Sequence, residues 1–176
     1  PSVIGGMIVD QNIEQWRANF GVCVESVFIG VQAALKVMQP QQSGSIINIS
    51  SVSSLKAGMA AGAYSAAKAA VNQFTMCAAM EAAPYNVRVN VVAPGAVMTP
   101  GLEASTMKSK AMQDAMAGAI PMGRIGTPEE MAAAICFLAS DAAAFITGVV
   151  LPVDGGKTPQ MYIPDFDLTA LDNQKI

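Results

Sequence analysis

The sequence predicts an α/β fold built around an open parallel sheet. Two apolar runs, 46–49 and 87–93, are each preceded by a longer stretch with helical character, so helix and strand alternate along the chain. Both runs open into small polar or Gly-containing loops, and an open α/β sheet places its ligand crevice beside such loops. With 176 residues and 52% apolar side chains, the chain can form one core, so we expect a single domain, 1–176.

The first elements are a long helix and a short buried strand. The helix is expected from about Ile13 to Met38, with Asp10 or Asn12 as its capping residue and Pro40 beyond its end. The strand 46–49 follows, and a Gly- and Ala-containing loop leads from it to the next helix.

The second helix begins in an Ala-rich stretch and carries Tyr64. It continues to about Ala83, where Pro84 and Asn86 turn the chain into the strand 87–93. That strand is Val-rich and is broken by a Pro-Gly pair, which by itself indicates a turn.

The last helix and strand have clear boundary signals. Thr127 caps the helix, Pro128 stands in its first turn, and the acidic pair 129–130 lies near the positive end of the helix dipole. The helix ends near Ser140, and 149–153 forms the last strand.

Two segments are expected to lie outside this core. Residues 96–123 lose strand character, and a pair of short amphipathic helices would explain their composition. They would also serve as a lid over an apolar substrate pocket, because methionine adapts to irregular partners. The tail 157–176 would drape over a neighbour or stay mobile. The methionines of the lid segment are Met98, Met107, Met112, Met116 and Met122.

Tyr64 and Lys68 stand at i and i+4, so their side chains share one face of the helix about one turn apart. A nearby ammonium favours the ionised form of a phenol, whose pKa is ordinarily about 10. Lowering that pKa to about 7 takes about 4 kcal/mol, which is more than one ammonium readily supplies in water. A second positive charge, together with partial desolvation, would make up the rest. Ser51, at the end of the preceding strand, is expected to donate a hydrogen bond to a substrate oxygen rather than act as a nucleophile.

Four motifs occur in a specific order and spacing, with Arg124, 126–130 and 145–148 as further matches. Together they resemble the short-chain dehydrogenases/reductases, from about Trp16 to Gly156. The motifs are Asn48-Ile49-Ser50-Ser51; Tyr64-Ser65-Ala66-Ala67-Lys68; Arg88-Val89-Asn90 with Pro94-Gly95-Ala96-Val97-Met98-Thr99; and Val153-Asp154-Gly155-Gly156.

The resemblance implies a Rossmann-like doubly wound parallel sheet, of which this chain is the C-terminal part, and NAD or NADP as cofactor. It implies Ser51, Tyr64 and Lys68 as the catalytic residues. Tyr64 would take or give the proton, and Lys68 would stabilise the phenolate and bind the nicotinamide ribose. The backbone of Val97 and the hydroxyl of Thr99 would engage the nicotinamide carboxamide. The cofactor-binding residues implied are Tyr64, Lys68, Pro94, Gly95, Val97 and Thr99.

Two departures from the family pattern stand out. The Gly-rich turn that holds the cofactor pyrophosphate does not occur in this sequence, so we expect a fragment of a longer polypeptide, with a natural short form as the alternative. The family's fourth catalytic residue, an Asn, aligns with Cys23, and a thiol cannot replace a carboxamide. Asn19, on the same helical face, would reach part of that network. Replacing Cys23 by Asn tests whether the thiol weakens the proton relay.

Composition narrows the function classes. The net charge of −3 with no basic cluster argues against nucleic acid or an anionic membrane as partner. The absence of His excludes imidazole triads and His-ligated zinc. Cys23, Cys77 and Cys136 lie in apolar helical patterns, which favours buried thiols over disulfides or a metal site and indicates a reducing compartment, the cytoplasm. No apolar run approaches the roughly 18 residues of a membrane span, and no export signal begins the sequence.

The expected function is NAD(P)-dependent interconversion of a secondary alcohol and a ketone. Two alternatives remain open at this level: reduction of a 3-oxoacyl thioester by the same chemistry, and a non-catalytic scaffold that keeps the fold. Charged residues make up only 13% of the chain, and the helices around Ala33 and Ala78 are Ala-rich. Both observations favour contacts between subunits, so we expect a homodimer or homotetramer.

Overall fold

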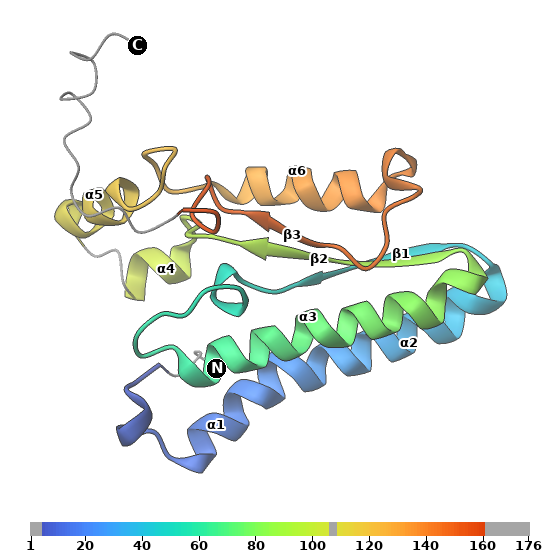
Figure 1. Cartoon of the computed structure of the whole chain (residues 1–176), viewed down its shortest axis with the longest axis horizontal. Helices are drawn as coiled ribbons and strands as arrows, with labels where there is room; N and C mark the ends of the chain where they lie inside the picture. Colours follow the sequence, from blue (N-terminus) through green and yellow to red (C-terminus); the bar gives the residue numbers. More distant parts are fainter. Residues whose placement is uncertain (1–4, 106–108, 161–176) are drawn as a thin grey trace, which may run out of the picture.

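The computed structural model describes residues 5–105 and 109–160, and its centre is a parallel sheet (Figure 1). Within these residues the strands are β1 (Gly44–Ile49), β2 (Val87–Pro94) and β3 (Val150–Val153), in the order β1-β2-β3. All three strand predictions are confirmed to within two residues at either end. Valines 87, 89, 91 and 92 are at most 1% exposed, because β2 is covered on both faces as central parallel strands are.

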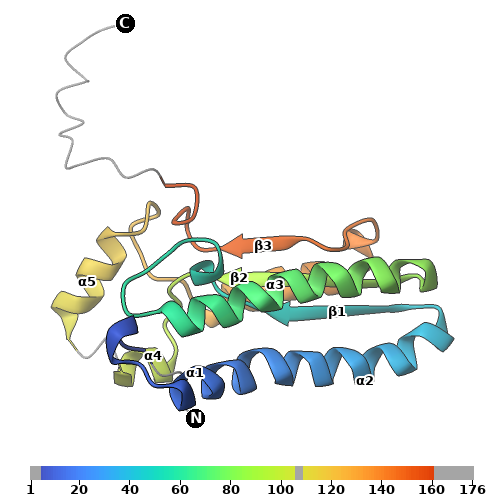
Figure 2. The same ribbon diagram turned by 60° about the horizontal axis from the view of Figure 1, so that its bottom comes forward.

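Helices cover both faces of the sheet. The pair α2 (Ser26–Gln41) and α3 (Gly62–Ala82) lies side by side on one face, and α6 (Pro128–Ala139) lies on the other (Figures 1 and 2). Each face has its own apolar cluster, one around Val31 and Val89 and one around Val92 and Leu138. The three strands point to the same edge of the sheet, where the first turns of α3 and α6 also lie (Figure 1). This layered arrangement confirms the predicted α/β fold with a parallel sheet.

The predicted helix from Ile13 to Met38 is interrupted. It consists of α1 (Ile13–Phe20), a π-helical segment η2 (Gly21–Glu25) and α2. Asn12 is the capping residue, and its side chain accepts from the backbone of Gln15 in a complete capping box. The expected end of the helix is wrong, because Pro40 lies inside α2. A proline in the last turn removes only one hydrogen bond, so the helix can absorb it before Gln42 turns left-handed at φ 56°.

The lid segment contains the two short helices expected of it. They are α4 (Pro100–Ser105) and α5 (Lys110–Gly118), while 106–108, with Met107, lie outside the described residues, as do 161–176 of the tail. Thr127 caps α6 as predicted, and together with Glu130 it forms a complete capping box. The remaining short helices are η1 (Ile8–Asp10), η3 (Val52–Ser54), η4 (Ala83–Tyr85) and η5 (Asp141–Ala143).

The cysteines correct one prediction. Cys23 is buried as expected, but Cys77 and Cys136 are exposed. They lie on faces of α3 and α6 that turn away from the sheet, and both helices are apolar around much of their circumference. An apolar pattern that runs around a helix cannot tell which face will be covered.

The stretch Ile13–Gln41 has the length and apolar composition of a membrane span, with a mean hydropathy of 1.6 and 11% of the window buried. One such helix is weak evidence, since apolar helices of soluble proteins pass the same test. Its inner face packs on the sheet through Val31, with Val27 and Leu35 alongside. The inner face of this helix is therefore part of the core, and its exposed apolar side chains, such as Ile29 and Val37, lie on the outer face.

Candidate active site

A cleft of about 530 Å³ lies at the carboxyl ends of β1 and β2. It is lined by residues from the loops that follow these strands, from the first turns of α3 and from α6. The seven residues expected to be catalytic or cofactor-binding all line this one cleft, although they span the chain from residue 51 to residue 99. They are Ser51, Tyr64, Lys68, Pro94, Gly95, Val97 and Thr99.

Side-chain hydrogen bonds tie α3 to the end of β1. Lys68 Nζ donates to the carbonyl oxygen of Ile49 at 2.9 Å, and Ser50 Oγ donates to the carbonyl oxygen of Lys68 at 3.0 Å. The ammonium is thereby held at the last residue of the strand, beside Ser51. Deeper in the core, Asn48 Nδ2 donates to Thr75 Oγ1 at 2.8 Å, which fixes the same helix against the same strand.

Ser51 is oriented by the turn that follows it. Its backbone is extended, with φ −161°, and its Oγ accepts a hydrogen bond from the backbone N–H of Ser53 at 3.2 Å. A hydroxyl has one proton to donate as well as lone pairs to accept with. Because a lone pair is used on Ser53, the Ser51 proton remains available for an oxygen in the cleft.

Burial raises the pKa of Tyr64, and a hydrogen bond with Ser51 lowers it by less. Burial also lowers the pKa of Lys68. The pKa of Tyr64 in this structure therefore lies above its ordinary value, whereas the sequence predicted that Lys68 would help to lower it. The Lys68 ammonium lies 5.8 Å from the centre of the Tyr64 ring and donates one of its three N–H groups to Ile49.

The loop after β2 brings backbone close to the cleft. A Cβ on Gly95 would lie 2.8 Å from Cα of Asp154, so only glycine fits there. Farther along, Val97 forms a parallel bridge with Gly126, which closes the base of the lid segment. Thr99 Oγ1 accepts from the backbone N–H of Leu102 at 3.2 Å, and its proton remains free to donate.

The structure adds polar residues that sequence reasoning missed. Asn72 Nδ2 donates to Ser54 Oγ at 2.8 Å, just behind the cleft. Asn72 lies one helical turn after Lys68, and Ser54 belongs to the serine-rich run that starts at Ser50. Their positions in the sequence could therefore have indicated that both lie near the cleft. On the apolar wall of the cleft, Met131 and Ile135 of α6 were missed because they come from a helix far along the chain.

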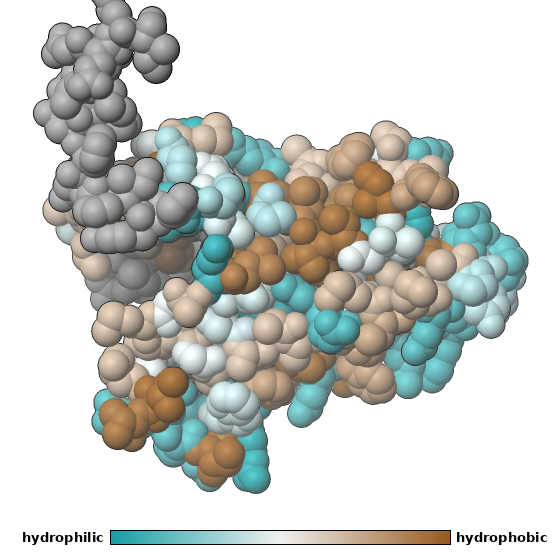
Figure 3. All heavy atoms as spheres, in the orientation of Figure 1, coloured by the Kyte–Doolittle hydropathy of each residue, from teal (hydrophilic) through white to brown (hydrophobic). Residues whose placement is uncertain are grey.

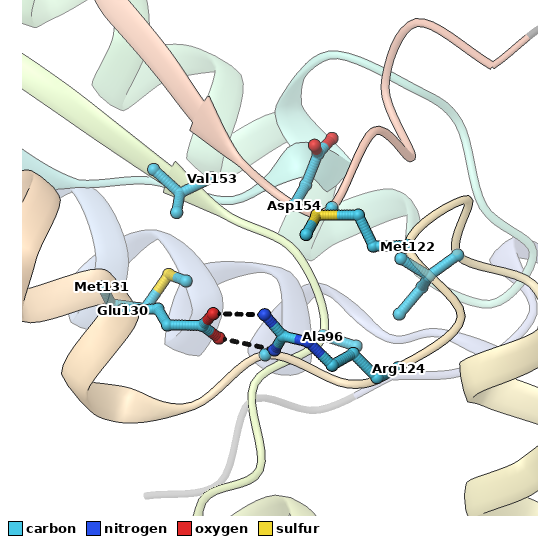
Figure 4. A pocket seen from close by; sticks show the side chains of 10 residues that line it. Ala96, Met122, Arg124, Glu130, Met131, Val153 and Asp154 are labelled. Carbon is cyan, nitrogen blue, oxygen red and sulfur yellow. Dashed lines mark hydrogen bonds and ion pairs between the residues drawn. The ribbon is translucent and has the colours of Figure 1, made fainter.

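A smaller cavity of about 110 Å³ adjoins the lid (Figure 4). In it Arg124 and Glu130 point at each other, and the guanidinium donates to both carboxylate oxygens at 2.9 and 2.5 Å. The bond from Arg124 and a second one from the backbone of Thr127 lower the pKa of Glu130 to about 2. This pair clamps the end of the lid segment to the start of α6.

The family model described as enoyl-(acyl carrier protein) reductase, of the short-chain dehydrogenase/reductase type, matches residues 1–158. The chain belongs to the short-chain dehydrogenase/reductase family.

Named relatives of this short-chain dehydrogenase/reductase chain are enzymes. It is 38% identical over 151 residues to cyclopentanol dehydrogenase of Comamonas testosteroni, covering 86% of this chain and 60% of that protein. It is 41% identical over 150 residues to 3-oxoacyl-(acyl-carrier-protein) reductase FabG of Thermotoga maritima, covering 85% of this chain and 60% of that protein. The chain thus spans about three fifths of the length of these relatives.

Solved structures show the same fold. A gluconate 5-dehydrogenase from Burkholderia cenocepacia, in complex with NADP and tartrate, superposes with a TM-score of 0.86 at 32% identity, over 92% of this chain and 63% of that one. ElxO with NADP bound gives a TM-score of 0.82 at 31% identity, over 91% of this chain and 64% of that one. These neighbours support the Rossmann-like fold class predicted for the dehydrogenase/reductase chain.

In this dehydrogenase/reductase chain, Cys23 lies beside the catalytic candidates. It is 5% exposed and stands in the middle of the π-helical segment η2. Together with Tyr64 and Lys68 it lines a second cleft of about 490 Å³ along the outer edge of β1. A negative charge on its sulfur would raise the pKa of both neighbours. Asn19 is buried in α1, and its Nδ2 donates to the carbonyl oxygen of Gln15 at 3.0 Å.

Proposed function

We propose that the protein is an NAD(P)-dependent oxidoreductase that interconverts a secondary alcohol and a ketone. The observation that carries this proposal is the convergence of a partly buried tyrosine, a lysine and an oriented serine on one cleft. Tyr64, Lys68 and Ser51 supply a proton, a positive charge and a hydrogen-bond donor to the same space. Those three groups are what carbonyl reduction and alcohol oxidation need.

The described residues suit a nicotinamide cofactor. Of the described side chains that line the cleft, Lys68 alone carries a charge, and it is positive. Lys68 and Tyr64 would hold the ribose, while Pro94 and Gly95 let backbone approach the ring closely. Val97 and Thr99 would hold the carboxamide, and the free Thr99 proton suits its oxygen. When bound, the nicotinamide supplies the hydride acceptor for oxidation and the hydride donor for reduction.

The chain's own groups handle the proton. In ketone reduction, the Ser51 O–H donates a hydrogen bond to the carbonyl oxygen, and Tyr64 gives its proton to that oxygen as negative charge develops there. In oxidation, the Tyr64 phenolate takes the hydroxyl proton. Because burial raises the pKa of Tyr64, the phenol is protonated near neutral pH, which favours the reductive direction there. Oxidation is expected to speed up as the pH rises.

The substrate class follows from the walls of the cleft. The lining of the cleft includes the apolar side chains of Leu102, Met131, Ala132 and Ile135. An alcohol or ketone with an apolar body fits this wall, and a small, highly charged substrate does not. Relatives named for cyclopentanol and for trans-4-hydroxycyclohexanecarboxylate make ring alcohols the first substrates to try.

Reduction of a 3-oxoacyl thioester is the second candidate, because a relative with that name is 41% identical. It uses the same three residues on a carrier-bound substrate. We place the enzyme in the cytoplasm, as expected from its unpaired thiols.

Replacing Tyr64 by Phe in the protein tests the proposal. We expect turnover to fall at least about a thousandfold while NAD(P)H binding stays close to that of the parent, because the ring remains and only the proton donor is lost. Turnover is followed by NAD(P)H absorbance with ring alcohols, ketones and 3-oxoacyl thioesters, and binding by calorimetry. Tyr85→Phe, a half-exposed position after α3, is the control.

Substantial remaining activity in Tyr64→Phe would remove Tyr64 from the acid/base role. Cofactor binding by the parent without turnover on the whole substrate panel would favour the non-catalytic scaffold instead.

A further inference from the structure

Two side chains behind the cleft form a directed chain of hydrogen bonds that ends on Ser51. Asn72 Nδ2 donates to Ser54 Oγ at 2.8 Å, and Ser54 Oγ donates to the carbonyl oxygen of Ser51 at 2.5 Å. The Ser54 hydroxyl has a single proton, so its bond to Ser51 leaves the lone pairs to Asn72. Both bonds are therefore made in one orientation, and they join the middle of α3 to the residue that follows β1.

Asn72 occupies a position where packing alone would favour an apolar side chain. It is 6% exposed and stands next to Val71, which is fully buried. Its Oδ1 has no hydrogen-bond partner among the described residues. A buried amide oxygen without a partner destabilises the fold relative to an apolar group of the same shape. The presence of an amide at this buried position is therefore explained by the hydrogen bond that its nitrogen donates to Ser54.

Ser51 is held from two sides as a result. Its carbonyl oxygen accepts from Ser54, and its Oγ accepts from the backbone N–H of Ser53 at 3.2 Å. With the backbone and the lone pair both engaged, the hydroxyl proton is directed into the cleft toward Tyr64. Loss of either support would let the turn after β1 rotate and would misdirect that proton.

We propose that Asn72 and Ser54 are positioning residues that hold the Ser51 hydroxyl toward Tyr64 and the substrate oxygen. The inference rests on the proposed function for what Ser51 does there, but the positioning itself has a readout that needs no substrate. The Ser51 hydrogen bond lowers the pKa of Tyr64, so the phenol reports where the hydroxyl points.

The experiment compares Ser54→Ala, Asn72→Leu and the double variant with the parent protein. The Tyr64 phenol is titrated by tyrosinate absorbance, and its signal is identified by subtracting a Tyr64→Phe variant. We expect each single variant to shift the Tyr64 titration to higher pH, up to the shift produced by Ser51→Ala. The double variant should shift it no further than either single one, because both residues act through one chain.

Turnover is the second readout. We expect Ser54→Ala and Asn72→Leu to lower kcat by about tenfold or more, as small misplacements of a catalytic group do, with cofactor affinity retained. Ser54→Thr keeps the hydroxyl and should restore both readouts. Two matched controls stand beside the tested positions: Ser53→Ala, whose bond to Ser51 comes from its backbone, and Gln73→Leu, an exposed amide on the same helix.

The outcomes separate the two proposals. If Ser54→Ala and Asn72→Leu leave the phenol titration and turnover at parental values, or lower only the melting temperature, the two residues serve packing and the inference is overturned. If the parent protein shows no turnover on any substrate, the proposed function fails, while the titration still decides whether Asn72 and Ser54 position Ser51.

Discussion

At the scale of single residues, the surroundings of Tyr64 favour the protonated form of its phenol. Burial raises the pKa of the phenol more than Ser51 lowers it, and burial lowers the pKa of Lys68. Desolvation acts on both groups against their charged forms. Burial therefore favours the protonated phenol over the phenolate near neutral pH. In the proposed reduction, a phenol that stays protonated can give its proton to the substrate oxygen.

Glu130 is predicted to make the fold sensitive to acid. Its pKa is lowered from 4.5 to about 2 by the side chain of Arg124 and the backbone of Thr127. A carboxyl whose pKa is depressed by folding adds stability above its unfolded pKa, and that stability is lost as the pH falls from 4.5 toward about 2. Glu130→Gln should melt lower than the parent at neutral pH, by roughly 1–3 °C because the pair is exposed, and the difference should vanish across that window.

Scanning calorimetry at a series of pH values measures this difference. Glu129→Gln, the preceding acid on the same helix, is the control. Curves that stay parallel through the acidic window would show that the Arg124 contact contributes nothing to folding.

At the scale of elements, the segment that follows α5 in the lid packs on the turn that follows β3. The backbone N–H of Met122 donates to the carbonyl oxygen of Gly155 at 3.1 Å, and Lys157 Nζ donates to that of Ala119 at 2.6 Å. Gly155 has φ +63°, and a Cβ there would lie 2.7 Å from Cγ2 of Ile120. The glycine therefore sets how closely the lid approaches the sheet.

Gly155→Ala should displace the lid. The left-handed backbone and the clash with Ile120 together should cost about 1–3 kcal/mol of unfolding free energy, measured by denaturant titration. The KM of the alcohol or ketone should rise while cofactor affinity holds, and trypsin should cut faster at Lys110. Gly118→Ala is the control, since nothing lies within 4 Å of its Cβ and alanine is the better helix former. An unchanged KM with faster global unfolding would assign Gly155 to stability alone.

At the scale of the whole molecule, the helix layer leaves an apolar surface. Met80, Ile29 and Val37 are 77%, 63% and 64% exposed on the α2 and α3 pair. Between these helices runs a groove of about 280 Å³ whose lining includes Lys36 and Glu81. A second copy of the chain packed on this face would cover these apolar side chains. We propose that this face forms the homodimer contact.

Apolar side chains also gather on other parts of the surface, along β3 and over the N-terminal segment before α1 (Figure 3).

Met80→Glu tests this assembly. A carboxylate in the centre of an apolar contact would be desolvated without a partner, so the dissociation constant of the dimer should rise by about tenfold or more. Analytical ultracentrifugation across a concentration series measures it. Met59→Glu, at a position 86% exposed in the loop before α3, is the control. Identical sedimentation of the parent and Met80→Glu would place the subunit contact elsewhere.

The sequence by itself determined what depends on neighbours in the chain. The spacing of Tyr64 and Lys68, the capping box of Thr127 and Glu130, and the Val-rich run of β2 all rest on residues within a few positions of one another. Propensity, capping and periodicity act over such distances, so the elements could be predicted with only small errors at their ends.

Only the tertiary structure decided how these elements use their polar groups. Lys68 donates to the carbonyl of Ile49, Asn72 donates to Ser54, and Arg88 donates to the carbonyl of Leu138 at the end of α6. Each partner lies between 18 and 50 positions away in the chain. Which donor meets which acceptor at that separation is set by the packing of helices on the sheet, and no local pattern encodes it.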